Sequence, residues 1–351
     1  AGGSNAVEGS TGPLHSLVSF LTALTHLDAD GRILVSPNRR SEASNPQGRL
    51  KFVLLNAAQH FKEVTDEAHA VLLAGGTLQP VSHIVDQLLP HLPEDRIHHF
   101  ACGHVIAPDR LLVSAVPRGP SGATLEFKHG TRSSDESVDE VGRLLLNVCK
   151  VVPDGVVCFL PSFSYEERVH ERLAASGTLA TISQVKQVFR EPRSAAEVEK
   201  VLAEYGEAIG GPGAAGGALL FAVVGGKMSE GINFSDRLGR CVVMIGLPYP
   251  NAADPELRER MAQLEASEMP LRETTNRPAG PRAMQRGTAS WEFYENICMK
   301  AVNQSIGRAI RHRNDYATVI LADRRYCHPD GPIAKLPAWM HESLHVHAGF
   351  G

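Results

Sequence analysis

The sequence lacks the patterns that mark several common protein classes. No apolar run approaches the roughly 18 residues that a membrane-spanning helix needs. No GxSxG motif is present, so a serine hydrolase site is not indicated. An excess of positive charge is also missing. The formal net charge is −4, so a polyanionic partner would have to bind a local basic patch rather than a general positive field.

Cysteine is scarce and shows no metal-binding spacing. The six cysteines form no CxxC pair, and four of them lie in apolar or helical stretches, so we expect reduced, buried thiols in an intracellular protein. The group His98, His99, Cys102 and His104 is irregularly spaced and does not favour zinc. An iron–sulfur cluster needs four thiolates brought together, which these scattered cysteines do not predict: Cys102, Cys149, Cys158, Cys241, Cys298 and Cys327.

The sequence also lacks a phosphate loop. The motif GxxxxGK[ST] is absent, and the nearest imitation, VVGGKM (223–228), has Met228 where Ser or Thr is required. A GxGxxG motif that follows a strand, with an acidic residue about 20 positions later, is missing as well. A nucleotide-binding metabolic enzyme is therefore disfavoured.

Residues Asp66 to His69 spell DEAH, the box of one class of helicases. A functional box follows a buried strand, so that its carboxylates emerge beside a phosphate loop. Here the residues before the box read as a helix, and the strand-like run AVLLAGG comes after it. We therefore predict that this box is the polar end of a helix and not a magnesium site.

What is present is an alternation of short apolar runs with amphipathic stretches. The 351 residues are 43% apolar, enough for two domains. The runs are nearly continuous, as in strands covered on both faces. We predict an α/β fold, a parallel sheet with helices on both faces. The expected strands are 32–37, 51–56, 70–76, 156–162, 218–226, 241–248 and 317–323.

The helical stretches have recognisable starts. One helix is expected over 137–152, and another begins at Ser194, which has capping-box spacing to Glu197. A long helix is expected from Ser290 to Arg313. Two stretches break the alternation: 206–218 is rich in Gly and Ala, and 267–290 is polar and aperiodic, so both are predicted to be loops, the second mobile or disordered.

Three stretches are typical of ligand sites. LLAGGTLQP (72–80) is an apolar run that ends in two glycines and Thr77, where strands of α/β sheets face ligands. The stretch 225–250 holds Ser229, Glu230 and Gly231 between two strands, and it is equally consistent with a phosphate-binding loop and with a structural loop.

The third stretch is QSIGRAIRHRNDY (304–316). Gln304, Arg308 and Arg311 have the spacing i, i+4, i+7, which would place an amide and two guanidiniums on one helix face. Guanidiniums suit phosphate because their forked donors match its oxygens and stay charged. The alternative is a solvated basic face.

In this order, the stretches resemble the C-terminal motor half of a superfamily-2 DNA helicase. The resemblance is to the XPD/FANCJ-like iron–sulfur branch, and within it to the sister-chromatid-cohesion type. GGTLQP (75–80) is similar to motif III, VVCFLPSF (156–163) to motif IV, KMSEGINFSD (227–236) to motif V and QSIGRAIRHRNDY to motif VI. CGHVI (102–106) and AKLPAW (334–339) resemble the cohesion type specifically.

The resemblance implies roles for individual residues. Arg308 and Arg311 would be the catalytic arginine fingers, and Gln304, Glu230 and Gly231 would face the nucleotide. Four residues would contact DNA or couple it to the nucleotide: Thr77, Ser162, Ser229 and Asn233. Asn233 departs from the family pattern, which often has Asp there. No metal ligand is implied in this chain.

The resemblance also implies an organisation. Residues 1–95 would be the end of a first RecA-like lobe with a remnant of the inserted arch, and 96–351 the second lobe, with a divergent insertion at 267–290. ATP and Mg²⁺ would be shared with first-lobe residues upstream of residue 1, where a 4Fe–4S cluster is also expected. The chain opens without an initiator Met, which indicates an internal start.

The implied partners are single-stranded and forked DNA, together with cohesion and replication-fork proteins, and the implied location is the nucleus. The alternative hypothesis is a natural truncated product that binds DNA or a protein without turnover. A complete reading frame upstream of Ala1 would favour the helicase, and an initiator codon just before it would favour the binding module.

The isolated chain is predicted not to hydrolyse ATP, because the phosphate-loop lysine, the magnesium ligands and the catalytic acid are missing. A steady-state ATPase assay of the pure chain with single-stranded DNA checks this. Turnover above background would contradict it.

Overall fold

The computed structural model describes residues 13–25, 30–37, 48–75, 78–211, 216–231, 233–268, 287–310 and 312–350. The chain divides into two compact units. The first comprises Ala1–Leu72, Val85–Pro93 and Asn251–Glu292, and the second Leu73–Ile84, Glu94–Pro250 and Phe293–Gly351. The units interleave along the sequence, so the division into lobes at residue 95 stays a prediction.

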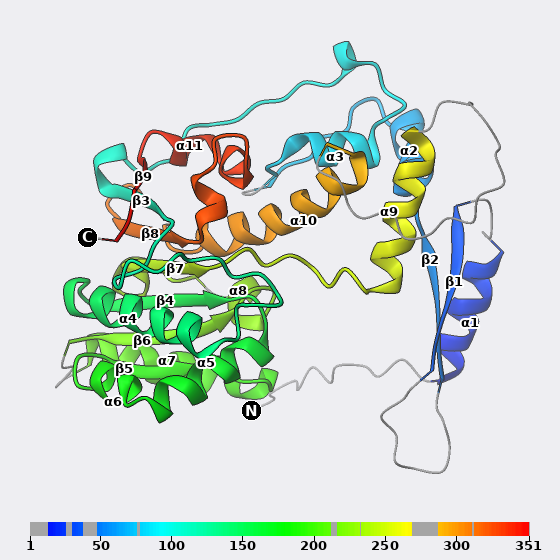
Figure 1. Ribbon diagram of the computed structural model, residues 1–351. Coiled ribbons are helices and arrows are strands. Elements are labelled where there is room, and N and C mark those ends of the chain that lie inside the picture. The colour runs from blue at the N-terminus through cyan, green and yellow to red at the C-terminus, as the bar shows by residue number, and fades with distance from the viewer. Residues whose placement is uncertain are drawn as a thin grey trace, which may run out of the picture. The chain divides into compact units, whose positions relative to one another are not determined.

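The second unit is built on a seven-stranded sheet in the order β5-β6-β4-β7-β8-β3-β9 (Figure 1). Every pairing in it is parallel. The predicted α/β class is therefore confirmed. The strands are β3 (Leu111–Val116), β4 (Gly155–Leu160), β5 (Gln187–Arg190), β6 (Ala218–Val223), β7 (Cys241–Ile245), β8 (Ala317–Ala322) and β9 (Leu344–Val346).

Helices cover both faces of this sheet, and two apolar cores result. Alternate residues of β4 show the division: Val157 and Phe159 pack in one core, Val156 and Cys158 in the other. The first core receives side chains from α7 (Val198–Gly210), α10 (Ala289–Ile306) and α11 (Ala338–His341). The second receives them from α4 (Asp135–Val151), α5 (Phe163–Ala175) and α6 (Thr178–Ser183). Continuous apolar strands are needed because both faces are buried.

The first unit contains a hairpin. β1 (Gly31–Pro37) and β2 (Gly48–Leu54) pair antiparallel, with Gly31 opposite Leu54. The helices with residues in this unit are α1 (Pro13–Leu24), α2 (Ala57–Glu67), α9 (Pro255–Glu268), part of α3 (Val81–Leu88) and the first residues of α10. The two strands confirm the runs at 32–37 and 51–56, but they do not join the parallel sheet.

Polar contacts attach α9 to the hairpin. Arg32 Nε lies 3.4 Å from Glu259 Oε2, and Lys51 forms an ion pair with Glu256. Gln263 Nε2 donates to Asp30 Oδ1 at 2.5 Å. Residues more than 200 positions apart therefore belong to one compact unit, a pairing that no local sequence pattern announces.

The DEAH spelling lies at the end of a helix, as predicted. Asp66 and Glu67 are the last two residues of α2, and Asp66 forms an ion pair with Lys62 one turn earlier. The strand predicted after it is wrong for the described residues 70–75, which have no regular structure. Leu72 is 90% exposed there, and a strand without a neighbour leaves its backbone groups unpaired.

Two helix predictions need correction. The Ser194 side chain caps no helix, because a 3₁₀ turn over Ala195–Glu197 precedes α7. The long helix ends at Ile306 and does not reach Arg313.

The predicted loop 206–218 begins inside α7, which continues to Gly210, and 212–215 lie outside the described residues. The middle of the predicted loop 267–290, residues 269–286, also lies outside them.

The sequence runs missed three strands. β3 follows a stretch with no clear periodicity, and β5 and β9 are only four and three residues long.

None of the helices in the described ranges combines the length and apolar character needed to cross a membrane.

Val141→Ala is expected to lower the free energy of unfolding by about 2–3 kcal/mol, because Val141 is fully buried in the core under α4 and its loss leaves a cavity. Val151→Ala, at the exposed end of the same helix, should change it by less than about 0.5 kcal/mol. Urea unfolding followed by circular dichroism measures both, and equal effects would contradict the assigned faces of α4.

Candidate functional site

Two loops of the second unit meet beside the sheet. The first follows β6: it passes through α8 (Lys227–Gly231) and then runs to β7. The second follows α10 and leads into β8. The backbone N–H of Phe234 donates to the carbonyl of Arg308 at 3.0 Å. The structure thus brings together the two stretches that the sequence singled out at 227–236 and 304–316.

A buried carboxylate strengthens this junction. The Asp315 side chain is fully buried, and its Oδ1 lies 2.7 Å from Arg240 Nη1. Its Oδ2 accepts the backbone N–H of Asp236 at 3.2 Å. The Arg240 guanidinium lies 3.9 Å above the ring of Tyr316. Arginine suits such a site because one planar group can pair with a carboxylate and stack on a ring.

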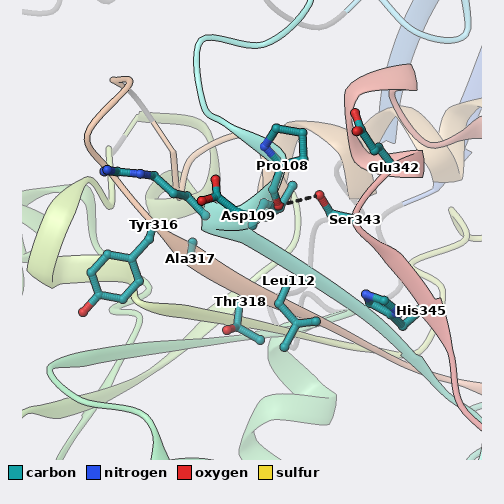
Figure 2. Close-up of a pocket in the computed structure, with 11 residues that line it drawn as sticks. Pro108, Asp109, Leu112, Tyr316, Ala317, Thr318, Glu342, Ser343 and His345 are labelled. Carbon is teal, nitrogen blue, oxygen red and sulfur yellow. Dashed lines mark hydrogen bonds between the residues drawn. The ribbon is translucent and has the colours of Figure 1, made fainter.

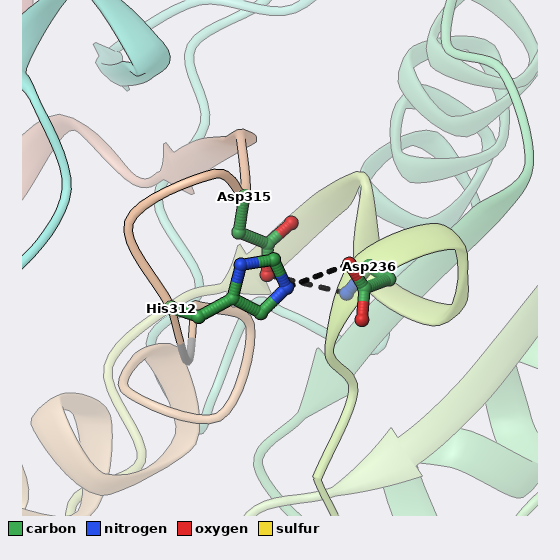
Figure 3. Close-up of side chains that lie close together, drawn as sticks. All are labelled: Asp236, His312 and Asp315. Carbon is green, nitrogen blue, oxygen red and sulfur yellow. Dashed lines mark hydrogen bonds and ion pairs between the residues drawn. The ribbon is translucent and has the colours of Figure 1, made fainter.

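A histidine completes the contact at the surface. His312 Nε2 lies 2.8 Å from Asp236 Oδ1, and both side chains are about half exposed. Figure 3 shows Asp236, His312 and Asp315 gathered where the two loops meet. These three offer ligand atoms within 4.8 Å of one another. The guanidinium of Arg240 already neutralises Asp315, so the group fits an ion-pair network better than a cation site.

Gln304 and Arg308 do not share a helix face, which corrects the sequence prediction. Gln304 is exposed on the last turn of α10, whereas Arg308 lies beyond the helix end and is half-buried. The backbone tightens there, because Arg308 N bonds to Ser305 O at 3.4 Å and Ala309 N to Ile306 O at 3.1 Å. Bonds of this i→i−3 type end an α-helix. Arg311 lies outside the described residues.

Ser229 is engaged locally. It is buried within α8, and its Oγ donates to the carbonyl of Gly226 at 2.8 Å. Glu230 and Gly231 are the last two residues of α8, and Asn233 is exposed just after it. Thr77, in the first ligand-like stretch, lies outside the described residues.

Ser162 caps a helix at the carboxyl end of β4. Its Oγ accepts the backbone N–H of Tyr165 at 3.3 Å and lies 3.1 Å from Ser164 Oγ. This is the usual role of serine at the first position before a helix.

Sequence reasoning missed Glu191. This residue follows β5 and is 5% exposed. Oε2 accepts the N–H of Val223 at 2.7 Å, and Oε1 accepts that of Met228 at 3.0 Å. The sequence allowed the loop after β6 to bind phosphate through its backbone N–H groups. In the structure, the N–H groups of Val223 and Met228 instead donate to the carboxylate of Glu191. An acid directly after the short run QVFR was the available signal, but the strand itself went unrecognised.

His104 and the buried cysteines pack against the protein interior. His104 Nδ1 accepts the N–H of Ile106 at 3.3 Å, its ring packs against Trp339, and burial lowers its pKa. Four thiols are buried as expected, and burial raises the pKa of Cys149 to about 12. The buried four are Cys149, Cys158, Cys241 and Cys298.

A separate hollow of about 610 Å³ lies at the amino ends of β3 and β8 (Figure 2). Asp109, Leu112, Thr318 and His345 are among its lining residues, and Ser343 Oγ donates to Pro108 O at its rim. Among the predicted site residues that the structure describes, none lines it. Tyr316, whose ring stacks with Arg240 at the junction of the two loops, also lines the hollow, so the hollow adjoins that junction.

Residues 145–343 match the helicase C-terminal domain family. The chain belongs to this family. It is 48% identical over 345 residues to the ATP-dependent DNA helicase DDX11 of Danio rerio, covering 97% of this chain and 37% of that protein. The DDX11 helicase of Mus musculus is also 48% identical over 345 residues, with 97% and 36% covered. The chain thus spans a little over a third of the length of these curated relatives.

The fold agrees with the same family. A solved XPD helicase structure superposes with a TM-score of 0.56 at 19% identity, covering 95% of this chain and 50% of that one. The predicted resemblance to a DNA helicase is confirmed by the matched family and the DDX11 relatives, and the XPD structure supports the fold. In this helicase C-terminal domain, the junction of the two loops coincides with the stretches that resemble motifs V and VI.

Asp315→Asn is expected to lower the free energy of unfolding by about 3–5 kcal/mol, because it removes the close counter-charge of the buried Arg240 guanidinium and leaves only Asp154, at 4.0 Å. Asp236→Asn, a change at a half-exposed position, should cost below about 1 kcal/mol. Chemical denaturation of both variants checks this.

The double variant Arg240→Met with Asp315→Leu is the control for that pair, because it removes both charges at once. It should be less destabilised than the sum of its single variants. Strict additivity would mean that the two side chains do not interact.

Proposed function

We propose that the chain is the C-terminal motor half of an ATP-dependent DNA helicase that couples ATP hydrolysis to translocation along DNA and its unwinding. The names of the DDX11 relatives support both the nucleotide and the DNA. We propose that the protein acts in replication, repair and sister-chromatid cohesion. Its proposed partners are single-stranded and forked DNA, together with cohesion and replication-fork proteins. The proposed location is the nucleus.

One observation carries the proposal: the two candidate loops form a single junction. The bond from Phe234 to Arg308 and the Asp315–Arg240 pair restrain both loops relative to the central strands β7 and β8. A displacement of one loop would therefore move the other. A motor needs such a link, because phosphate chemistry at one group must change the grip on DNA at another.

Charge and geometry suggest a division of roles. Arg308, with Arg311 beyond it, would stabilise the negative charge that spreads over a transferring phosphoryl group. Gln304 and the end of α8 at Glu230 and Gly231 would face the nucleotide. Asn233 is exposed beside the junction and would pass its movement to DNA, together with Thr77, Ser162 and Ser229.

The hydrogen bonds of the Ser162 and Ser229 hydroxyls limit the roles that these two residues can have. Ser162 accepts a cap bond and Ser229 donates to Gly226. Ser229 has already donated its hydrogen, whereas the Ser162 hydroxyl, which lies 3.1 Å from Ser164 Oγ, can still donate. We therefore propose that Ser229 shapes the loop, and that Ser162 directs the amino end of α5 toward the DNA backbone, where its N–H groups favour phosphate.

The described residues do not fit two metal groups of the family. Asp236, His312 and Asp315 are committed to the ion-pair network, so they do not fit a magnesium site. The buried thiols lie in cores on opposite faces of the sheet, Cys158 and Cys241 in one and Cys298 in the other, so they do not fit an iron–sulfur cluster. Any Mg²⁺ that accompanies ATP, and any 4Fe–4S cluster, is proposed to be held by the upstream half.

The proposed lobes follow from this function. Residues 96–351 would form the second RecA-like lobe around the seven-stranded sheet, and residues 1–95 the end of the first lobe and its arch. The hairpin of β1 and β2 would belong to the arch remnant. The helix α9 contacts this hairpin and shares its compact unit, so we propose that α9 packs with the arch although it lies in the second lobe by sequence.

Arg308→Ala, in the chain joined to its native upstream half, is expected to lower the rate of single-turnover ATP hydrolysis about 10³–10⁵-fold, or roughly 4–7 kcal/mol. Arg311→Ala should act alike. Binding of single-stranded DNA should be retained, because the lost charge serves the transition state. Quench-flow hydrolysis and fluorescence anisotropy measure the two quantities.

Arg313→Ala is the matched control, since Arg313 is an exposed arginine in the same loop. It should turn over within about threefold of the wild type. Unchanged hydrolysis in Arg308→Ala would remove the main support for the proposed function.

A further inference from the structure

Glu191 is a buried carboxylate outside the stretches that resemble helicase motifs. It follows the edge strand β5, and its own N–H bonds to Phe221 O of the neighbouring strand β6 at 2.8 Å. Its side chain reaches across the end of β6 to accept the N–H groups of Val223 and Met228. It thus spans both ends of the turn that links β6 to α8.

The turn is shaped around this carboxylate. A Cβ placed on Gly226 would lie 2.2 Å from Glu191 Oε1, so a larger residue at that position would displace the carboxylate. Gly225 has a φ of +73°, which also favours glycine. The next residues form α8, which has only five residues and cannot hold its own position by helix propensity.

The neighbours of Glu191 attach the same segment to α5. Arg190 forms two hydrogen bonds with Glu166, at 2.6 and 2.8 Å, and Glu166 is almost fully buried. Arg193 lies over the ring of Phe163 at 5.3 Å. Residues 190–193 therefore bridge the helix capped by Ser162 and the helix that carries Ser229 and Glu230.

Burial alone opposes a charge at this place. Desolvation raises the pKa of Glu191, and hydrogen bonds from the N–H groups of Val223, Met228 and Lys227 oppose the shift. A glutamine in the same position keeps one carbonyl oxygen, but its NH₂ group would face a backbone donor. The site is therefore specific for a group that only accepts hydrogen bonds.

We propose that Glu191 is a positioning residue of the motor, which holds the turn at 223–228 and thereby sets the place of α8 relative to the amino end of α5. This inference rests on the proposed function, because it assigns to Glu191 the alignment of the nucleotide-facing residues Glu230 and Gly231. Glu191 acts through backbone amides and does not touch the reacting groups.

The test uses the full-length protein with Glu191→Gln, Glu191→Asp and Glu191→Ala. Hydrogen exchange of the 223–228 amides, read by mass spectrometry, should rise at least tenfold in Glu191→Gln while the amides of β4 stay protected. DNA-stimulated kcat should fall at least tenfold, with the KM for ATP within threefold. Glu191→Asp keeps the charge on a shorter arm and should lie between wild type and Glu191→Gln.

Two controls separate positioning from general loss of stability. Val141→Ala destabilises the same unit from the other core, and should leave kcat within twofold at a temperature where it is folded. Glu167→Gln removes an exposed carboxylate that pairs with Arg193 at 3.1 Å, and should behave as wild type. If Glu191→Ala does not fold, Glu191→Gln still decides the question.

The inference is overturned if exchange at 223–228 is unchanged in Glu191→Gln, or if kcat of that variant stays within twofold of wild type. Failure of the proposed function looks different: the wild-type protein would show no DNA-stimulated hydrolysis. The exchange measurement would then still decide whether Glu191 holds the turn, and an unchanged turn would overturn the inference by itself.

Discussion

Strand ends in a sheet buried on both faces leave backbone N–H groups without partners, and buried carboxylates satisfy several of them here. Glu191 accepts one N–H group at the end of β6 and one after it, and Asp315 accepts one before β7. Asp323, fully buried after β8, accepts the N–H of Phe127 at 3.0 Å and pairs with Arg325. An unpaired buried N–H costs about 1–3 kcal/mol, so these acids determine where each loop can lie.

The same acids explain how loops far apart in the sequence are held together. A carboxylate has two oxygens, and Asp315 and Glu191 use them on different partners. Asp315 binds Arg240 with one oxygen and the backbone of Asp236 with the other. Glu191 holds the two ends of one turn. The loops that carry the candidate site residues are therefore placed by charges that are themselves outside the proposed chemistry.

This arrangement suits a motor lobe. A lobe that grips and releases must have a rigid sheet and loops whose movements are linked, because a nucleotide can shift only what it is mechanically connected to. The apolar cores on both faces supply the rigidity. The Phe234–Arg308 bond and the ion pairs around Asp315 supply a link between loops that resemble motifs V and VI.

The sequence by itself determined the fold class and the central strands. The runs at 156–162, 218–226, 241–248 and 317–323 are continuous and apolar because both of their faces are covered, and that requirement is visible in composition alone. The order of four motif-like stretches was equally sufficient for the family. The misplaced DEAH spelling could be rejected from its local context, because the helix around it is a local property.

Only the tertiary structure decided what depends on contacts between distant residues. The helix α10 ends at Ile306, where i→i−3 hydrogen bonds tighten the backbone and Phe234 donates to the carbonyl of Arg308. Gln304 and Arg308 therefore do not share a helix face, although their spacing predicted one. The roles of Ser162 and Ser229 as local hydrogen-bonding groups, and of Glu191 as the partner of the turn, depend on atoms brought together by folding. Spacing along a chain predicts neighbours only while the helix or strand continues, and these residues lie where it ends.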